Sequence, residues 1–469
     1  MLSRAAAALV LFFVLLLCGS PPPTSDTRDR TPRPEAFERA LPINPYDYDR
    51  RRMLEVLDLA EAAGVNSIVS GATWWHMAPR PPGGDGDYRV EQLDRLVDEC
   101  SRRGLRLTLQ LTGTPDWVHP GLRRTVPDPS DRVWHPPRGE DELEHFAGFV
   151  RFVVGRYGTA VGRYEIWNEP NSVDFWRPEP HPGEYATLLR TAYLEAKRTD
   201  PRVTVASGGL SMNDLGFLRQ YYDAARRYPD AGRHRHFFDV LGVHPYTDGR
   251  SPDWSGPGRI VAGPFGPVDH SFAGLRGMKT VMDENGDAEK GIFVGEFGYP
   301  DRATEEAWMK PVPDRRRALY LKRAYAIAED LPFVLGLTWY AYVPGSAVGD
   351  EWAILDADLD PGPTYVALAQ ATGGAAHRGP RVVLPAPKDP ATGGRVERPT
   401  LDGPDDIEAE AWELYVDGEL LVESASPSLP WDTRNVEDGP HTILVAAYTD
   451  DGSVWVSEPI TLTVLNSPG

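Results

Sequence analysis

A chain of 469 residues that is 41% hydrophobic and 10% aromatic has room for more than one domain and can bury a large core, which excludes a disordered protein. Its formal net charge of -20 excludes nucleic acid as the main partner, because phosphate binding needs a cationic face. The two cysteines, Cys18 and Cys100, exclude a framework of several disulfides, and the 11 dispersed histidines lack the spacing of metal ligands, so we expect no metal and no cofactor.

The N-terminus carries the pattern of a secretory signal. Arg4 precedes an apolar run over residues 5–17 that is shorter than a membrane-spanning helix needs, with a membrane anchor as the alternative. We therefore expect residues 1–20 to be a signal peptide and the protein to be extracellular or on the cell surface. Cys18 resembles the cysteine of a bacterial lipoprotein box, although Leu17 stands where that box usually has a small residue, so a lipid anchor stays open. Residues 21–38, rich in Pro, Thr, Arg and Asp, predict a tether.

Residues 39–375 alternate apolar runs typical of strands with amphipathic patterns typical of helices. Such alternation predicts parallel strands joined by helical crossovers, and eight units fit a closed (β/α)₈ barrel, a TIM barrel of the α/β class. An open doubly wound sheet is the alternative, which the lack of a Gly-rich turn after the first strand disfavours. The strands are expected at 41–43, 65–70, 105–111, 164–167, 203–207, 240–244, 292–295 and 336–340. The helices are expected at 51–63, 90–103, 141–157, 183–198, 214–228, 272–285, 315–329 and 363–372.

Residues 376–469 predict a linker and a small all-β sandwich of the Ig-like kind. Polar and apolar residues alternate there, and Asp-Gly pairs such as Asp417-Gly418 and Asp451-Gly452 are typical of turns between antiparallel strands. The strands are expected at 412–417, 419–423, 441–449 and 454–464. Because this module lacks a cluster of acid, base or aromatic residues, we expect it to be dispensable for catalysis, in a chain that would still fold if it ended near Gly374.

Two glutamates stand directly after short apolar runs. Glu169 follows Tyr164-Glu-Ile-Trp-Asn168, and Glu296 follows Gly291-Ile-Phe-Val-Gly295. Residues at the C-terminal ends of barrel strands face the active site, so the fourth and seventh strands would aim both carboxylates across one mouth. Glycoside hydrolysis needs such a pair, one carboxyl to protonate the leaving oxygen and one to attack or to activate water. A solvated surface position is the ordinary alternative for a single glutamate.

The neighbours of the two glutamates suit the same chemistry. Trp167 gives Glu169 an apolar flank, which raises the pKa of a carboxyl so that it can hold a proton near neutral pH. Asn168 adds an amide that can bond a sugar hydroxyl. His244 and Tyr246 end the sixth strand and would face the same way in an extended chain, where both could bond Glu296 or the sugar. A histidine with a purely structural role is the alternative.

Tryptophans gather near the predicted strand ends. Core packing is the ordinary role of an indole, but sugar rings also stack their C–H faces on indoles, and this bias toward strand ends favours sugar contacts. Trp339, at the end of the eighth strand, is the foremost candidate for substrate binding. Trp74 and Trp117 are further candidates, and the same group includes Trp75 and Trp176.

Taken together, these motifs resemble those of a known enzyme group. Ile166-Trp-Asn-Glu-Pro170, His244-Pro-Tyr246, Val294-Gly-Glu-Phe297 and Trp339 are similar to the motifs of clan A glycoside hydrolases, in particular the β-xylosidase-like family 39 and the cellulase-like family 5. The resemblance covers roughly residues 40–375. The C-terminal module resembles bacterial Ig-like domains, for example in Tyr415-Val-Asp-Gly418; such domains usually act as spacers or attachment units.

The resemblance implies roles for single residues. It implies Glu169 as acid/base, Glu296 as nucleophile, Asn168 as the ligand of the sugar 2-hydroxyl, His244 and Tyr246 as supports, and Trp339 as the floor of the subsite at the cleaved bond. Retention implies carboxyl groups about 5–5.5 Å apart. Members of the group often have an Arg near the nucleophile on the second strand, where this chain has Val69. Either another cation replaces that Arg or the nucleophile has less support.

The sequence therefore predicts a secreted or lipid-anchored retaining glycoside hydrolase that acts on a β-linked oligo- or polysaccharide. Two alternatives stay open. A carbohydrate-binding surface protein could have kept the barrel and lost turnover, and a transglycosidase would use the same residues with a sugar acceptor in place of water. The sugar, endo or exo action and the oligomeric state are left undetermined, and the loop over residues 247–267 is expected to decide the first two.

Overall fold

The computed structural model of the protein describes residues 36–304, 309–343, 349–373, 381–383, 400–402 and 408–466. The expected signal peptide, with Cys18, and all but the end of the expected tether lie outside these residues. Among the helices that are described, none is both long and apolar enough to cross a membrane. Residues 31–469 form one compact unit.

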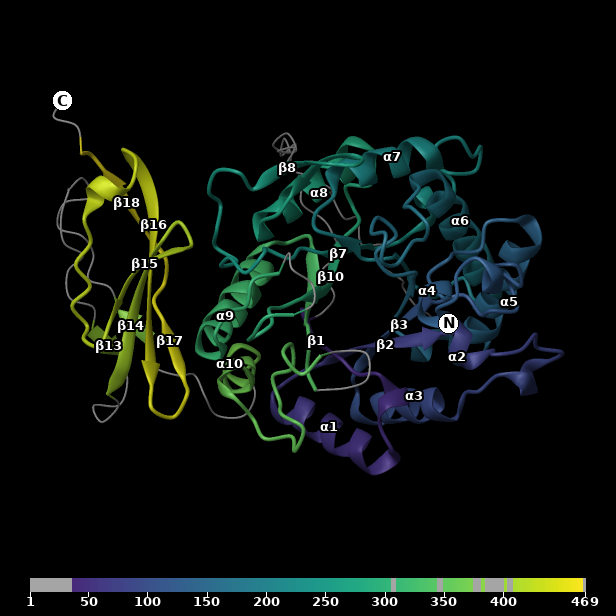
Figure 1. Ribbon diagram of the computed structural model, residues 1–469, viewed down its shortest axis with the longest axis horizontal. Coiled ribbons are helices and arrows are strands. Elements are labelled where there is room, and N and C mark those ends of the chain that lie inside the picture. Colours follow the sequence, from purple (N-terminus) through teal and green to yellow (C-terminus); the bar gives the residue numbers. More distant parts are fainter. Residues whose placement is uncertain are drawn as a thin grey trace, which may run out of the picture. The chain divides into compact units, whose positions relative to one another are not determined.

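Eight parallel strands close into a barrel, around which the helices are arranged (Figure 1). The first strand pairs with the last, and a bridge between Ala206 and Val240 joins the fifth to the sixth, so the ring has no open edge. The predicted (β/α)₈ barrel is thus confirmed, and the open doubly wound sheet is excluded. The barrel strands are β1 (Glu38–Pro42), β2 (Ser67–Thr73), β3 (Arg106–Thr112), β4 (Arg163–Ile166), β5 (Val205–Ser207), β7 (Leu241–His244), β10 (Ile292–Phe297) and β11 (Val334–Trp339), with the short β6 (Leu210–Ser211) beside β7.

Each expected helix is found close to its predicted bounds. Local signals explain several ends: the Asp49 side chain accepts a hydrogen bond from the Arg52 N–H at the start of the first helix, and Gly104 ends another with a φ of 69°. The main helices are α1 (Arg50–Ala62), α3 (Glu91–Arg103), α5 (Glu140–Tyr157), α6 (Pro182–Thr199), α7 (Leu215–Ala225), α8 (Leu275–Glu284), α9 (Asp314–Asp330) and α10 (Pro363–Ala371). The elements that were not expected include the short helices α2 (Trp74–Met77) and α4 (Pro129–Arg132), and a hairpin of β8 (Ile260–Gly263) and β9 (Gly266–Asp269).

A buried ion pair lies at the N-terminal end of the barrel interior. Arg163 of β4 bonds Glu38 of β1 at 2.7 Å, and both side chains are almost fully buried. The guanidinium of Arg163 also lies 4.0 Å from the centre of the Phe293 ring. β1 begins three residues before the predicted strand because Glu38 is buried by this pairing. From the sequence alone, a glutamate at this position is expected on the surface.

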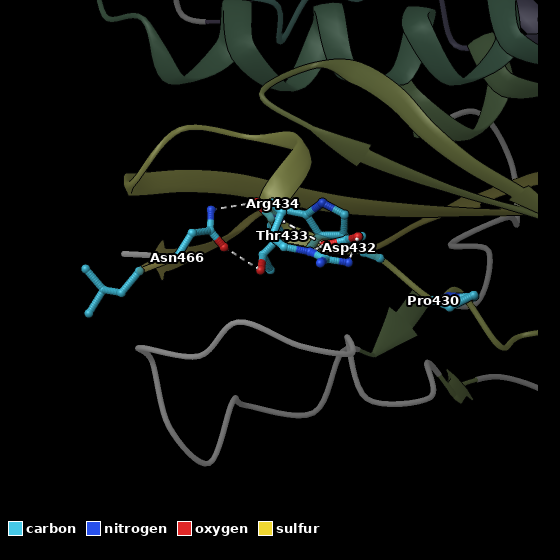
Figure 2. Close-up of a pocket in the computed structure, with 7 residues that line it drawn as sticks. Pro430, Asp432, Thr433, Arg434 and Asn466 are labelled. Atoms are coloured by element: carbon cyan, nitrogen blue, oxygen red, sulfur yellow. Dashed lines mark hydrogen bonds and ion pairs between the residues drawn. The ribbon is translucent and has the colours of Figure 1, made fainter. Parts of the chain in front are cut away.

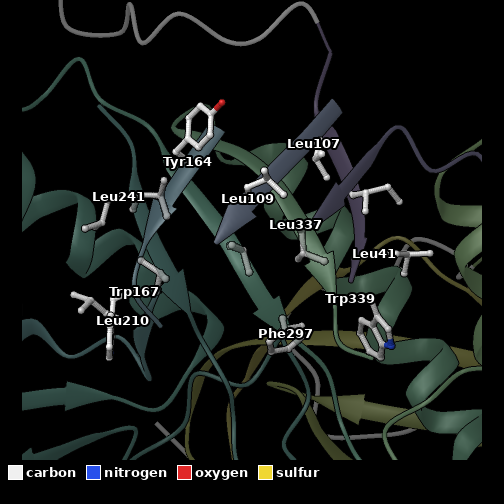
Figure 3. Packing of buried hydrophobic residues seen from close by; sticks show 14 of the residues in the cluster. Leu41, Leu107, Leu109, Tyr164, Trp167, Leu210, Leu241, Phe297, Leu337 and Trp339 are labelled. Carbon is white, nitrogen blue, oxygen red and sulfur yellow. The ribbon is translucent and has the colours of Figure 1, made fainter. Parts of the chain in front are cut away.

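The apolar core lies between the strands and the surrounding helices. Leu107 and Leu109 of β3, Leu337 of β11 and Trp167 after β4 are fully buried members of one large cluster (Figure 3). Side chains on the other face of each strand point into the barrel, as the period of two requires. The active-site face is therefore built by inner-face residues near the C-terminal strand ends.

The C-terminal module is an antiparallel sheet, as predicted. Its order is β15-β14-β16-β17, and β18 also pairs with β16. The run expected as one strand over 454–464 is divided in two, because Pro459 has no N–H to donate to a ladder. The strands are β14 (Ala409–Val416), β15 (Glu419–Ser424), β16 (Gly439–Thr449), β17 (Val454–Val456) and β18 (Ile460–Val464), with β12 (Arg381–Val383) and β13 (Thr400–Asp402) as a separate pair.

The module has a surface pocket of roughly 550 Å³ at the end of β18 (Figure 2). Asn466 bonds the Thr433 hydroxyl at 2.9 Å there, and Arg434 pairs with Asp432 at 2.6 Å. Asp432 is the one carboxylate among the lining residues, and it is already paired. The pocket therefore lacks the carboxylate pair that the predicted chemistry needs.

The C-terminal sheet is joined to helix α9. Glu413 of β14 is fully buried, and its Oε1 accepts a hydrogen bond from Arg316 of α9 at 2.7 Å. Its Oε2 accepts one from the Tyr415 hydroxyl at 2.6 Å. Lys322 of α9 donates to the backbone carbonyl of Val454. Two half-buried cations of α9 thus have hydrogen-bond partners in the module.

Candidate active site

Glu169 follows β4 in an unusual backbone conformation. Trp167 and Glu169 have φ values of 74° and 38°, in the left-handed region that residues with a Cβ rarely adopt. The Glu169 N–H donates to the Gly209 carbonyl at 3.1 Å, and the residue is only 7% exposed. Such strain tends to persist where the surrounding structure holds a functional residue, so the conformation supports a role for Glu169.

Glu296 reaches the barrel mouth through a β-bulge. In the pairing of β10 with β11, Val294 is opposite Leu337 and Phe297 is opposite Trp339, so β10 has one extra residue. Strict alternation would put Gly295 and Phe297 on one face, with Glu296 between the strands and the helices. The bulge instead turns Glu296 toward the mouth, which is how bulges re-aim side chains beside active sites.

His244, at the end of β7, joins the two glutamates. Its Nδ1 lies 2.9 Å from Glu169 Oε1 and 3.7 Å from Glu296 Oε2. One oxygen of each glutamate and the ring nitrogen all lie within 4.8 Å of one another. The hydroxyl of Tyr246 donates to Glu296 Oε2 at 2.9 Å. The structure therefore brings together four of the residues expected from the sequence.

Burial and charge set the protonation of this cluster. Burial raises the pKa of Glu296 to about 7, against the opposing influence of the His244 cation. Burial also disfavours a charge on His244, but the carboxylates of Glu296, Glu169 and Glu165 outweigh it and raise the pKa of His244 to about 9. The protonation of His244 and that of Glu296 therefore depend on each other.

Asn168 belongs to a second network that includes two residues missed by the sequence interpretation. Gln110 of β3 donates through Nε2 to Asn168 Oδ1 at 3.1 Å and to Glu165 Oε1 at 2.9 Å. Glu165 lies in β4, is 1% exposed, and burial raises its pKa. Its place four residues before Glu169, on the inner face of a strand, was the signal that could have found it.

Glycines make room for the histidine. A Cβ added at Gly209 would lie 2.0 Å from His244 Nε2, and one at Gly295 would lie 2.9 Å from the same atom. The Gly209 N–H also donates to Glu165 Oε1 at 3.2 Å. The absence of a side chain at these two positions is what allows His244 to lie against the backbone of its neighbours.

Trp339 and Tyr340 lie on opposite faces of β11. A Cβ on Gly336 would lie 2.4 Å from Glu38 Cβ, so position 336 faces the barrel interior, and the period of two puts Tyr340 on the same inner face. Trp339 points outward, is 0% exposed, and packs 6.0 Å from the ring of Phe297 (Figure 3). This packing argues against the expected sugar contact of Trp339.

Tyr340, which directly follows β11, is the aromatic residue at this strand end that borders the site. It is partly exposed and packs in one cluster with Tyr246 and Trp352, at 5.6 Å from the Trp352 ring. Tyr246 in turn bonds Glu296. Trp339 was expected here because tryptophan is a typical sugar-binding residue. The sequence alone does not indicate on which face of the strand this residue lies.

The other expected tryptophans are mostly packed. Trp74 is 1% exposed and stacks on Phe149 of α5 with ring centres 5.6 Å apart. Trp117 is half-buried and donates its indole N–H to the Ala78 carbonyl at 2.8 Å. These contacts are typical of structural residues.

Trp75 has an open ring beside the end of β3. It is 42% exposed, and a Cβ on Gly113 would come within 2.5 Å of its Cδ1. Gly113 has a φ of 78° and provides a flat seat for the indole. Among the tryptophans near the ends of β2 and β3, Trp75 is therefore better exposed for stacking on a sugar than Trp74.

Val69 has no charge to offer the nucleophile, and its side chain is partly buried among apolar residues. It packs against the cluster that includes Phe293 and Leu335 in the barrel interior. Within the part of the chain that the structure describes, the ion pairs of Glu169 and Glu296 involve only His244. His244 is thus the cation of the site.

No protein-family model matches the chain. A curated relative is a β-xylosidase of Geobacillus stearothermophilus, 27% identical over 167 residues, which are 34% of this chain and 32% of that protein. The match spans about a third of the length of that relative.

Solved structures share the fold across most of the chain. A family 39 glycoside hydrolase from Bacteroides cellulosilyticus WH2 has a TM-score of 0.57 at 20% identity, covering 85% of this chain and 79% of that one. A GH39 β-xylosidase from Caulobacter crescentus has a TM-score of 0.53 at 14% identity, with 90% and 79% covered. An endo-β-1,4-mannanase from Thermotoga petrophila has a TM-score of 0.50 at 16% identity, with 92% and 99% covered. The chain therefore has the fold of clan A glycoside hydrolases.

Proposed function

We propose that the protein is a retaining glycoside hydrolase that cleaves a β-linked oligo- or polysaccharide, with Glu169 as acid/base and Glu296 as nucleophile. The observation that carries the proposal is the carboxylate pair of the buried Glu169 and the half-buried Glu296, which has oxygens within 4.8 Å of each other and His244 in contact with both. Retaining enzymes hold their carboxyl groups about 5–5.5 Å apart, whereas inverting enzymes need about 6.5–9.5 Å to admit a water. The observed spacing supports retention.

In the first step, the Glu296 carboxylate attacks the anomeric carbon while the bond to the leaving oxygen breaks. Glu169 gives its proton to that oxygen. The Tyr246 hydroxyl holds Glu296 Oε2, which leaves Oε1 free to attack. A covalent glycosyl-enzyme is formed, with the anomeric configuration inverted once.

In the second step, Glu169 acts as a base. It takes a proton from water, the water oxygen attacks the anomeric carbon, and the bond to Glu296 breaks. The second inversion restores the β configuration. His244, bonded to Glu169, stabilises the carboxylate that Glu169 becomes once it has given up its proton.

The comparisons are compatible with a glycosidic substrate. The relative and the solved structures that share sequence or fold are a β-xylosidase, a family 39 glycoside hydrolase and an endo-β-1,4-mannanase. Their different sugars support a β-linked substrate class and no narrower one.

The roles of the glutamates can be separated by substitution and azide. Glu296→Ala should abolish hydrolysis of every substrate, because no covalent intermediate can form. Glu169→Ala should retain the first step with a nitrophenyl glycoside, whose leaving group needs no protonation, and then accumulate the glycosyl-enzyme. Azide should speed that variant and yield the β-glycosyl azide, which mass spectrometry and NMR identify.

The stereochemistry of the azide product decides the assignment. In the Glu296→Ala variant, azide can enter only from the vacated side and would give the α product. A β azide from Glu296→Ala and an α azide from Glu169→Ala would exchange the two roles. Undiminished turnover in both variants would refute the hydrolase proposal.

Two other functions use the same site. A transglycosidase would release disaccharide or longer products when sugar acceptors are added, and a binding protein would retain substrate affinity without turnover. The ordered carboxylate pair favours catalysis over binding alone, and product analysis with and without acceptors separates hydrolysis from transfer.

We also propose that the protein is exported, from the signal pattern of residues 1–20. Mass spectrometry of the mature N-terminus from its native host is the test. Cleavage after residue 17 with a lipid on Cys18 would make it a lipoprotein, and an uncleaved N-terminus would contradict export by this signal.

A further inference from the structure

A third carboxyl group lies inside the barrel at the acid/nucleophile pair. Glu165 is 1% exposed, and its Oε1 accepts hydrogen bonds from Gln110 Nε2 at 2.9 Å and from the Gly209 N–H at 3.2 Å. Neither of the two chemical steps uses it. Burying a carboxyl group costs free energy, so its presence calls for a reason.

The hydrogen bonds of Gln110 fix which end of the Asn168 amide faces inward. Glu165 Oε1 accepts from Gln110, so Gln110 must present its NH₂ group on that side. The same NH₂ group donates to Asn168 Oδ1 at 3.1 Å. With its oxygen held in this way, Asn168 has its Nδ2 hydrogens left to donate elsewhere.

The second oxygen of Glu165 argues against a purely structural role. Oε2 is buried and has no hydrogen-bond partner among the described residues. It lies beside Gly295, where an added Cβ would be 3.6 Å from it and 2.9 Å from His244 Nε2. A carboxyl group retained only for stability would have partners at both oxygens, since buried polar groups normally do.

We propose that Glu165 and Gln110 are positioning residues that hold the Asn168 amide with its Nδ2 ready to donate to a substrate hydroxyl. This inference rests on the proposed glycosidase function. It extends the site by two residues that act through Asn168 and do not touch the sugar. The order of action is Glu165, then Gln110, then Asn168.

Double-mutant cycles test this order. Glu165→Met and Gln110→Met remove the acceptor and the relay at nearly unchanged size, and each should lower kcat/KM by about 10–100-fold, the usual effect of losing a partner that orients an active-site ligand. Combined with Asn168→Ala, Gln110→Met should add no further loss, because Gln110 acts through Asn168. Glu165→Met should lose that part of its effect in the same background and keep the part that comes from its charge beside His244. A further comparison uses aryl glycosides that each lack one hydroxyl. The glycoside whose kcat/KM falls least in Asn168→Ala should also be the one whose kcat/KM falls least in Glu165→Met, because it lacks the hydroxyl that Asn168 binds.

Further variants keep the test decisive. Glu165→Gln retains an oxygen that can accept from Gln110, so it should recover part of the activity lost in Glu165→Met. If Glu165→Met does not fold, Gln110→Met leaves Glu165 in place and serves for the same cycle. A loss in Gln110→Met that multiplies with that of Asn168→Ala would overturn the proposal, since it would mean that Gln110 acts elsewhere in the site or on the fold alone.

A crystal structure of Gln110→Met gives a readout that is independent of activity. The Asn168 side chain should turn or adopt two orientations, while an unchanged, well-ordered amide would overturn the proposal. If the parent protein hydrolysed no glycoside, the proposed function would fail, and this structure would still decide whether Gln110 orients Asn168.

Discussion

His244 carries a positive charge beside three carboxyl groups. Its imidazole lies 2.9 Å from Glu169 Oε1 and 3.7 Å from Glu296 Oε2, and its pKa is raised to about 9. At neutral pH the ring is therefore a cation. Of the two alternatives that Val69 left open in the sequence, this charge favours another cation beside the nucleophile over a nucleophile with less support.

Loss of this cation should change the pH profile. His244→Asn removes a charge that favours the Glu296 carboxylate, so the pKa of Glu296 should rise and the acidic limb of kcat/KM should move to higher pH, by about one unit for roughly 1.4 kcal/mol of lost interaction. Tyr246→Phe removes a hydrogen bond from the same carboxylate and should move the limb in the same direction. The measurement is the pH dependence of kcat/KM on a nitrophenyl glycoside, and a limb that stayed or moved to lower pH would contradict the role of His244.

The same charge bears on metal binding. Donor atoms of Glu169, His244 and Glu296 lie within 4.8 Å of one another, close enough to hold a metal ion. A protonated imidazole, however, has no lone pair to offer a metal. We expect hydrolysis to be unchanged after dialysis against EDTA. Activity that disappeared and returned with added Zn²⁺ or Mn²⁺ would show that the triad is a metal site.

The loop between β5 and β6 is shaped to receive a side chain from the next strand. Its Gly209 leaves the space that His244 Nε2 occupies, since a Cβ there would lie 2.0 Å away. Gly209→Ala should therefore displace His244 and lower kcat/KM by at least about 100-fold, as expected when catalytic groups shift by an ångström.

Gly148→Ala is the matched control for that change. Gly148 lies in α5, and a Cβ added there would meet nothing within 4 Å. This control should leave kcat/KM unchanged and add about 0.5–1 kcal/mol to the free energy of unfolding, because alanine suits a helix better than glycine does. If Gly209→Ala also left kcat/KM unchanged, the position of His244 would not depend on this glycine.

Hydrophobic periodicity predicted the strands and helices of the barrel well, but it did not predict which residues point into the barrel. Each barrel strand and each main helix was found, because apolar runs at a regular spacing report burial directly. Glu296 was found from its neighbours, but the bulge that turns it inward leaves no signal in composition. Trp339 was expected at the site because the sequence indicates where a strand ends and not which face its last residue lies on. Glu165 was overlooked because a carboxyl group inside a barrel is rare.

The contact between the C-terminal sheet and α9 changes what is expected of a shortened chain. A chain that ended near Gly374 would leave the Arg316 and Lys322 side chains of α9 without Glu413 and the Val454 carbonyl. These contacts run against the expectation that the barrel folds well by itself. The module makes specific hydrogen bonds to the barrel, which a simple spacer would not need.

Glu413→Ala tests this connection in the full chain. The change leaves Arg316 and the hydroxyls of Tyr415 and Tyr448 without a buried partner, so the free energy of unfolding should fall by about 3 kcal/mol. Glu419→Ala, an exposed position of β15, should stay within about 0.5 kcal/mol of the parent. Denaturant unfolding measures both. Equal stability of the two variants would mean that the module contributes little to the barrel.

The pairing of β1 with β11 also affects when the barrel can fold during synthesis. The strand that starts the barrel is made first and its partner is made last, so β1 keeps one edge free while the remainder of the barrel is synthesised. Contacts between residues so distant in sequence form slowly. The barrel cannot close until its eighth strand has been synthesised, so the chain stays unfolded for longer. This delay is useful for a chain that is expected to leave the cell, because export through a membrane pore requires an unfolded chain.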